Sequence, residues 1–219
     1  MMMKGLTNVF LTESAEAKLL ALNLSHQILI NSIAQGQAAR NSATSNHPAT
    51  AGGTMAFFEV VRALRDHLLP AGWKIENVRN LSMTVNPETN MAIVVSGGSK
   101  ETGLIEGHPT TRNSKGEQTK SYLANNQRDL FGDLEETDES MDFRVIEGVG
   151  QTWLLLYFCD FSKREVRAEL SLPTDIDSFG RVGAWQERII LDSIALDNVT
   201  IDIEPNFTPE IEIEIKRKA

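Results

Sequence analysis

Acidic side chains stand on or beside the apolar segments in the second half of the chain. They are Asp160, Glu165, Glu169, Asp175, Asp177 and Glu187. Carboxylates that converge on a divalent ion are the basis of metal-dependent hydrolysis. A nuclease-like site also requires a lysine two residues after one of the acids. The segment Glu165-Val166-Arg167 has an arginine there, which stays protonated and cannot act as a base. We therefore expect a solvated strand face rather than a metal site.

A loop that contains several glycines, Ser96–Gly103, follows an expected strand. Glycines after a strand can present backbone N–H groups to a phosphate, and Lys100 would add positive charge. The spacing differs from the G-x-x-x-x-G-K-[ST] pattern, and no amphipathic helix follows. The pattern favours a plain glycine loop, with a small phosphate-ligand site as the alternative.

The histidines and the cysteine form no catalytic or metal-binding pattern. Cys159 is the only cysteine, which excludes an intramolecular disulfide and a thiolate zinc cluster. It lies in the apolar run Trp153–Phe161, so we expect a buried and inert thiol. No metal-ligand spacing and no nucleophile-elbow sequence accompany the four histidines, which we expect to be structural or exposed. These are His26, His47, His67 and His108.

One compact apolar peptide, Gln127–Phe131, stands near the end of the polar stretch Gly97–Asp142. A leucine–phenylalanine pair at this place has no local core to join. Small apolar anchors flanked by solvated residues are what a short docking peptide requires. The alternative is that Leu130 and Phe131 cover the edge of this protein's own core.

The pentapeptide Gln127-Arg128-Asp129-Leu130-Phe131 resembles the motif by which bacterial DNA polymerases, repair proteins and replication-control proteins dock on the β sliding clamp. The resemblance implies that Gln127 is the anchoring glutamine and that Leu130 and Phe131 fill the apolar pocket of the clamp. Asp129 suits a position that tolerates acids, whereas Arg128 departs from the frequent leucine at a variable position. The match covers only this short segment of 219 residues. Docking on another protein is the alternative.

The chain is acidic, with a net charge of −9 and a pI of about 5.0. This charge argues against a broad phosphate-binding surface, which would require a basic patch. The polar stretch holds scattered basic residues but little aromatic interleaving beyond Tyr122, so direct nucleic-acid binding is not expected. The basic residues are Arg112, Lys115, Lys120 and Arg128.

Acids are concentrated in the run Asp133–Asp142 and in the last two expected strands. A negative face of this kind can mimic DNA phosphates toward a basic protein. Ordinary solvation is the alternative explanation. The candidate acidic surface consists of Glu135, Glu136, Asp138, Glu139, Glu210, Glu212 and Glu214.

Helical periodicity in the first third of the chain predicts the elements that precede these segments. The first helix is expected to begin at Thr12 or Ser14 and to fade near Gln35. The second is expected from Thr54 to Leu68. A single apolar stripe is predicted on it, made of Phe57, Phe58, Val61, Leu64 and Leu68.

Period-two alternation predicts strands in the remainder of the chain. The segments Trp73–Val85 and Met91–Val95 flank an Asn/Pro turn and predict a β-hairpin. A loop is expected at Pro173–Gly180. Further strands are predicted at Gln151–Phe161, Val166–Leu172, Val182–Ile194, Val199–Ile203 and Ile211–Ile215.

Together these patterns predict an α+β fold in which two N-terminal helices pack on one face of a mainly antiparallel sheet. We expect one domain over residues 1–219, with the polar insertion 97–142 held out in solvent. The chain has no signal peptide or apolar span, so we expect a cytoplasmic protein without membrane association. We expect no cofactor.

The leading functional hypothesis is a non-enzymatic accessory or regulatory factor that docks on the bacterial sliding clamp. One alternative is an acidic adaptor or inhibitor that occupies a nucleic-acid-binding surface of a partner protein. The other is a small phosphate-ligand or metal-dependent hydrolase.

Overall fold

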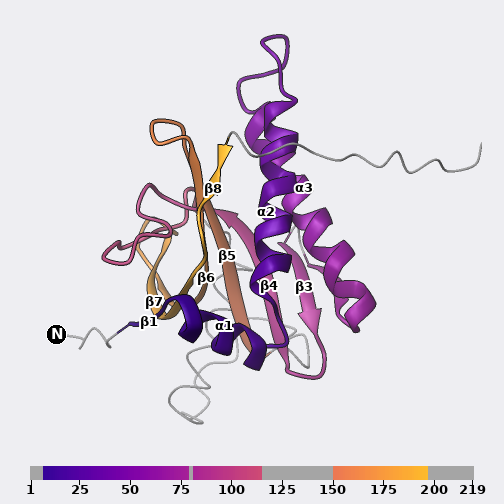
Figure 1. Ribbon diagram of the computed structural model, residues 1–219, viewed down its shortest axis with the longest axis vertical. Helices are drawn as coiled ribbons and strands as arrows, with labels where there is room; N and C mark the ends of the chain where they lie inside the picture. The colour runs from indigo at the N-terminus through magenta and orange to yellow at the C-terminus, as the bar shows by residue number, and fades with distance from the viewer. Residues whose placement is uncertain (1–6, 79–80, 115–149, 197–219) are drawn as a thin grey trace, which may run out of the picture.

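A computed structural model describes residues 7–78, 81–114 and 150–196 (Figure 1). These ranges contain helices and strands of one mixed sheet, which confirms the α+β class. The elements are β1 (Asn8–Phe10), α1 (Thr12–Ala21), α2 (His26–Asn41), α3 (Ala51–Leu68), the 3-10 helix η1 (Leu69–Ala71), β2 (Lys74–Val78), β3 (Leu81–Asn86), β4 (Met91–Gly97), β5 (Gln151–Asp160), β6 (Glu165–Ile176), β7 (Val182–Ile190) and β8 (Ile194–Ala195).

The first predicted helix is in fact two, α1 and α2, so the expectation of two helices was wrong. The break has a local cause. Asn23 adopts a left-handed backbone conformation with φ 56°, which ends α1. The Ser25 side chain then accepts a hydrogen bond from the Ile28 N–H and caps the start of α2.

Helices α2 and α3 lie side by side (Figure 1). Their close approach depends on Gly36, where an added Cβ would stand 2.2 Å from a methyl carbon of Val60 and 2.9 Å from the Ala56 carbonyl oxygen. The predicted stripe on α3 is correct at Val61, Leu64 and Leu68, which are buried, but wrong at Phe58, which is 64% exposed. Successive residues lie about 100° apart around a helix, so Phe58 falls outside the buried face of α3.

The sheet has the strand order β1-β7-β6-β5-β4-β3-β2, with β8 pairing separately with β6. The pairs β4–β5 and β1–β7 are parallel, and the other pairs are antiparallel. The predicted hairpin is a three-stranded unit, β2-β3-β4. Strand β6 also continues through part of the predicted loop, because Pro173 sits at an irregularity in its pairing with β7, where a missing N–H is tolerated.

Both faces of the sheet are apolar at their centres. On β6, Val166, Ala168 and Leu170 belong to the cluster that includes the buried residues of the helices. The alternate residues of a strand face the other side, where Leu154, Leu156, Val182 and Trp185 belong to a second cluster. The sheet is therefore packed against the helices on one face only, and this second face is available to other parts of the chain.

The predicted strands at 199–203 and 211–215 lie outside the described residues. Within the parts of the chain that the structure describes, no helix combines the length and apolar character needed to cross a bilayer.

Candidate functional site

The parallel pairing of β4 and β5 means that residues 98–150 connect the carboxyl end of one strand to the amino end of its neighbour. We call residues 98–114 the crossover arm. The arm is not held out in solvent as predicted. Gly98 and Thr111 form a β-bridge across it, and Thr102, Pro109 and Thr111 are buried. The arm packs against the second face of the sheet.

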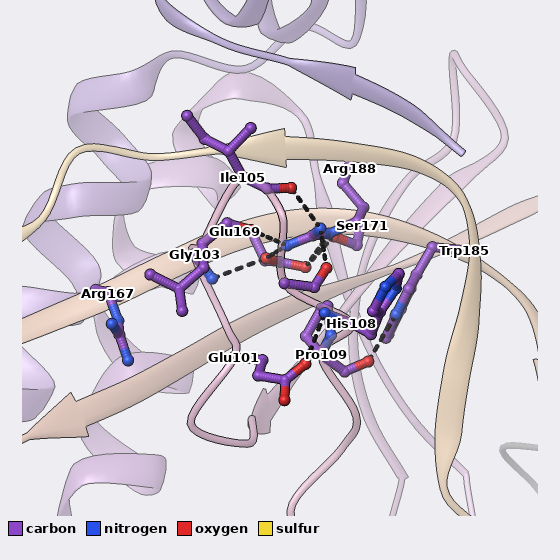
Figure 2. A network of polar contacts seen from close by, with 12 residues as sticks. Glu101, Gly103, Ile105, His108, Pro109, Arg167, Glu169, Ser171, Trp185 and Arg188 are labelled. Atoms are coloured by element: carbon purple, nitrogen blue, oxygen red, sulfur yellow. Dashed lines mark hydrogen bonds and ion pairs between the residues drawn. The ribbon is translucent and has the colours of Figure 1, made fainter. Parts of the chain in front are cut away.

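A fully buried ion pair holds the arm in place (Figure 2). Glu169 on β6 is 0% exposed and Arg188 on β7 is 3% exposed. Their guanidinium and carboxylate groups form a two-point contact, with Nη2–Oε2 at 2.5 Å and Nε–Oε1 at 3.1 Å. The Gly103 N–H and the Ser171 hydroxyl donate to the same carboxylate, each at 2.8 Å. Four donors fill the acceptor sites of a carboxylate, so Glu169 has no remaining site for a metal ion or a substrate proton.

Arg188 uses its other N–H groups to bind the backbone of the arm. It donates to the carbonyl oxygens of Leu104 at 3.0 Å and Gly107 at 2.7 Å, with a longer contact to Ile105 at 3.5 Å. The prediction of a solvated strand face was therefore wrong for Glu169. Its side chain alternates with the core residues of β6 and so faces the crossover arm.

Arg167, which stands where a nuclease would have its lysine, also holds the arm. It is 6% exposed and donates to the Lys100 carbonyl oxygen at 2.6 Å. The carboxylates of Asp160 and Glu165 lie 3.5 and 3.7 Å from its guanidinium nitrogens. The guanidinium also lies over the Phe158 ring at 5.5 Å. These contacts give Arg167 a structural role.

The other predicted acids are used in turns or ion pairs rather than gathered together. Asp160 Oδ1 accepts hydrogen bonds from Ser162 and Lys163, and the Ser162 hydroxyl is the main cause of a lowered pKa at Asp160. Glu187 pairs with Lys18 at 2.6 Å. Over residues 7–78, 81–114 and 150–196, no group of three His, Cys, Asp or Glu side chains is placed to hold a metal ion.

The loop Ser96–Gly103 does not form a phosphate cradle, because most of its backbone donors already have partners within the protein. Gly98 donates to the Tyr157 carbonyl, Ser99 to that of Thr110, Thr102 to that of Ser99, and Gly103 to Glu169. The local structure agrees with the plain glycine loop that the sequence favours.

An open hollow of about 660 Å³ lies where the crossover arm meets the turn between β6 and β7. It is lined by Arg112, Asn113, Ser114, Phe179 and Arg181. We call this opening, with the residues that line it, the arginine hollow. The Phe179 ring is 80% exposed. Arg112 and Arg181 therefore line one opening together with an exposed aromatic residue.

Cys159 is partly buried rather than fully buried as predicted. Burial raises the pKa of its thiol, although the charge of Arg40 opposes the shift. A raised pKa leaves less thiolate at pH 8, so we expect native protein to react with iodoacetamide more slowly than a free cysteine. Unfolding in urea should restore the ordinary rate, which mass spectrometry of quenched samples would measure. Faster alkylation of the native protein would contradict this.

The residues predicted to bind partners lie outside the described ranges. This applies to Gln127, Asp129, Leu130 and Phe131, and to the acidic surface Glu135, Glu136, Asp138, Glu139, Glu210, Glu212 and Glu214. Sequence reasoning missed Arg188, Phe179 and Arg181. The Asp and Gly of the turn before Arg181 did indicate a loop, but no sequence signal placed that loop beside Arg112.

Comparison with known proteins found no matching family model, no matching curated protein and no matching solved structure.

Proposed function

We propose that this protein is a non-enzymatic interaction protein that docks on the bacterial β sliding clamp through Gln127–Phe131. The observation that carries the proposal is the position of this pentapeptide in the chain. It falls within the connection between β4 and β5, which is far longer than the roughly dozen residues that a crossover requires. Connections of such length within a compact domain often carry a function.

Support also comes from the two described ends of this connection. On one side, the Arg112 N–H donates to the Gly97 carbonyl at 2.8 Å. On the other side, the Gly150 N–H donates to the Asn90 carbonyl at 2.7 Å. These hydrogen bonds hold the two described ends of the connection, and the pentapeptide lies between those ends in the sequence.

The hydrolase alternative has less support. Its two candidate sites were the strand carboxylates and the loop Ser96–Gly103. The Glu169 carboxylate is filled by internal donors, and the backbone donors of the loop are largely occupied. The acidic-inhibitor alternative depends on residues outside the described ranges.

The test is binding to an immobilised, purified bacterial β clamp, measured by surface plasmon resonance. Replacing both Leu130 and Phe131 with alanine is expected to weaken binding by more than about thirtyfold, because the loss of even one central apolar anchor costs about 2 kcal/mol. Leu134→Ala is the matched control, since it removes a nearby leucine outside the motif and should leave affinity unchanged. Retained binding by the double variant, or no binding by the unaltered protein, would reject the proposal.

A further inference from the structure

We propose that the arginine hollow binds a single-stranded polynucleotide, with phosphates on Arg112 and Arg181 and a base stacked on Phe179. This site is separate from the pentapeptide, and the proposal does not depend on clamp docking. Guanidinium groups bind phosphate oxygens through paired N–H donors. Single-stranded nucleic acids are held by such cations together with aromatic rings on which bases stack.

The two arginines are brought together by a backbone contact between segments far apart in the sequence. The Thr111 N–H donates to the Val182 carbonyl at 2.9 Å, and the Val182 N–H donates to the Thr111 hydroxyl at 3.2 Å. Arg112 follows Thr111, and Arg181 precedes Val182. The hydrogen-bonded pair therefore places both guanidinium-bearing residues at the same opening.

The turn that carries Phe179 and Arg181 is fixed by its own hydrogen bonds. Asp177 Oδ1 accepts from the N–H groups of Phe179 at 2.9 Å and Arg181 at 2.8 Å. Gly180 supplies the left-handed conformation, with φ 77°, that closes the turn. A backbone ordered before binding reduces the entropy cost of holding a ligand. The same contacts use one carboxylate oxygen of Asp177 within the turn.

The side chains that line the hollow are available to a ligand. Among the described residues, neither Arg112 nor Arg181 has an ion-pair partner. By contrast, Arg167 and Arg188, which also contact the crossover arm, are paired and buried. The Phe179 ring is so exposed that it contributes little hydrophobic stabilisation to the fold, but its face is open for stacking.

The chemistry favours a polynucleotide over an acidic peptide. An acidic peptide would use the two arginine cations but not the aromatic ring, whereas a nucleotide would use both. Asn113 adds a side-chain amide that can hydrogen-bond the edge of a base. The net charge of −9 opposes binding at long range. We therefore expect a weak, salt-dependent contact of few phosphates rather than an extended footprint.

Fluorescence anisotropy with labelled oligothymidylate and oligouridylate tests this in the full-length protein. Arg112→Ala and Arg181→Ala should each weaken binding about tenfold. Each should also reduce the slope of log affinity against log salt by about 0.7, the value for one phosphate on a single strand. Phe179→Ala should weaken binding at least about fivefold without changing that slope.

Matched controls are available on α3. Arg62→Ala removes one exposed guanidinium, and Phe58→Ala removes one exposed ring, both away from the hollow. Both should bind as the unaltered protein does. Arg181→Lys, which keeps the charge without the planar pair of donors, should give an intermediate affinity.

Several outcomes would overturn the proposal. The first is that neither oligonucleotide binds at low salt. The second is that the hollow variants and the control variants lose the same affinity. The third is that Arg112→Ala and Arg181→Ala each leave the affinity unchanged. Equal binding of labelled polyglutamate, insensitive to Phe179→Ala, would instead assign the hollow to acidic peptides and reject a polynucleotide.

Discussion

Replacing Arg188 with leucine is expected to lower the free energy of unfolding by about 3–5 kcal/mol. The substitution leaves the Glu169 carboxylate, which is 0% exposed, without its charged partner. It also removes the side-chain donor of the Gly107 carbonyl and one of the two donors to the Leu104 carbonyl, which keeps the Gly107 N–H. Urea unfolding followed by tryptophan fluorescence would measure the loss, and Trp185 is a suitable reporter because its indole N–H binds the arm at the Pro109 carbonyl.

An exposed arginine provides the control. Arg62 on α3 pairs with Glu59 and Asp66 at the surface, and Arg62→Ala should change stability by less than about 1 kcal/mol. A double variant, Glu169→Leu with Arg188→Met, should recover part of the loss, because removing both charges removes the penalty for burying one alone. If Arg188→Leu cost no more than Arg62→Ala, the ion pair would not be what holds the arm.

Gly36→Ala is expected to lower the free energy of unfolding by about 2 kcal/mol, in the range found for overpacked interiors. The added methyl group would meet the Val60 side chain at 2.2 Å and the Ala56 carbonyl at 2.9 Å, so α2 and α3 would have to separate. Gly53→Ala is the matched control. It makes the same change within α3, where an added Cβ meets nothing within 4 Å.

Opposite signs are expected for the two glycines. Gly53→Ala should raise stability by about 0.5–1 kcal/mol, because alanine loses less backbone freedom than glycine when a helix forms. Thermal or urea unfolding of both variants would show the difference, and the circular dichroism of the folded proteins should be the same. A stabilising Gly36→Ala would mean that the helices do not approach each other as closely as the structure has them.

The clearest secondary structure could be predicted from the sequence because its signals are local. The stripe Val61, Leu64 and Leu68 repeats at helical spacing, and Val166, Ala168 and Leu170 alternate as a strand requires. The break between α1 and α2 was missed, because apolar residues continue at helical spacing past Asn23 while only its backbone conformation ends the helix.

The candidate sites also differ in whether a local sequence pattern can reveal them. The pentapeptide Gln127–Phe131 is a contiguous pattern, so the sequence alone suggests it, and its function stays a prediction. The arginine hollow joins Arg112 to Phe179 and Arg181, and no local pattern links positions so far apart. The same is true of Glu169 and Arg188, whose burial requires two neighbouring strands and the arm above them.

The sequence by itself determined the α+β class, the acidic character of the chain and the helical and strand segments that carry clear apolar periodicity. These follow from composition and from contacts between near neighbours. Only the tertiary structure decided that β4 and β5 are parallel, that the crossover arm is bound to the sheet, and that Glu169 is buried against Arg188. Strand pairing and burial depend on which distant segments meet. The energy of a buried charge such as that of Glu169 is set by its charged partner rather than by its position in the sequence.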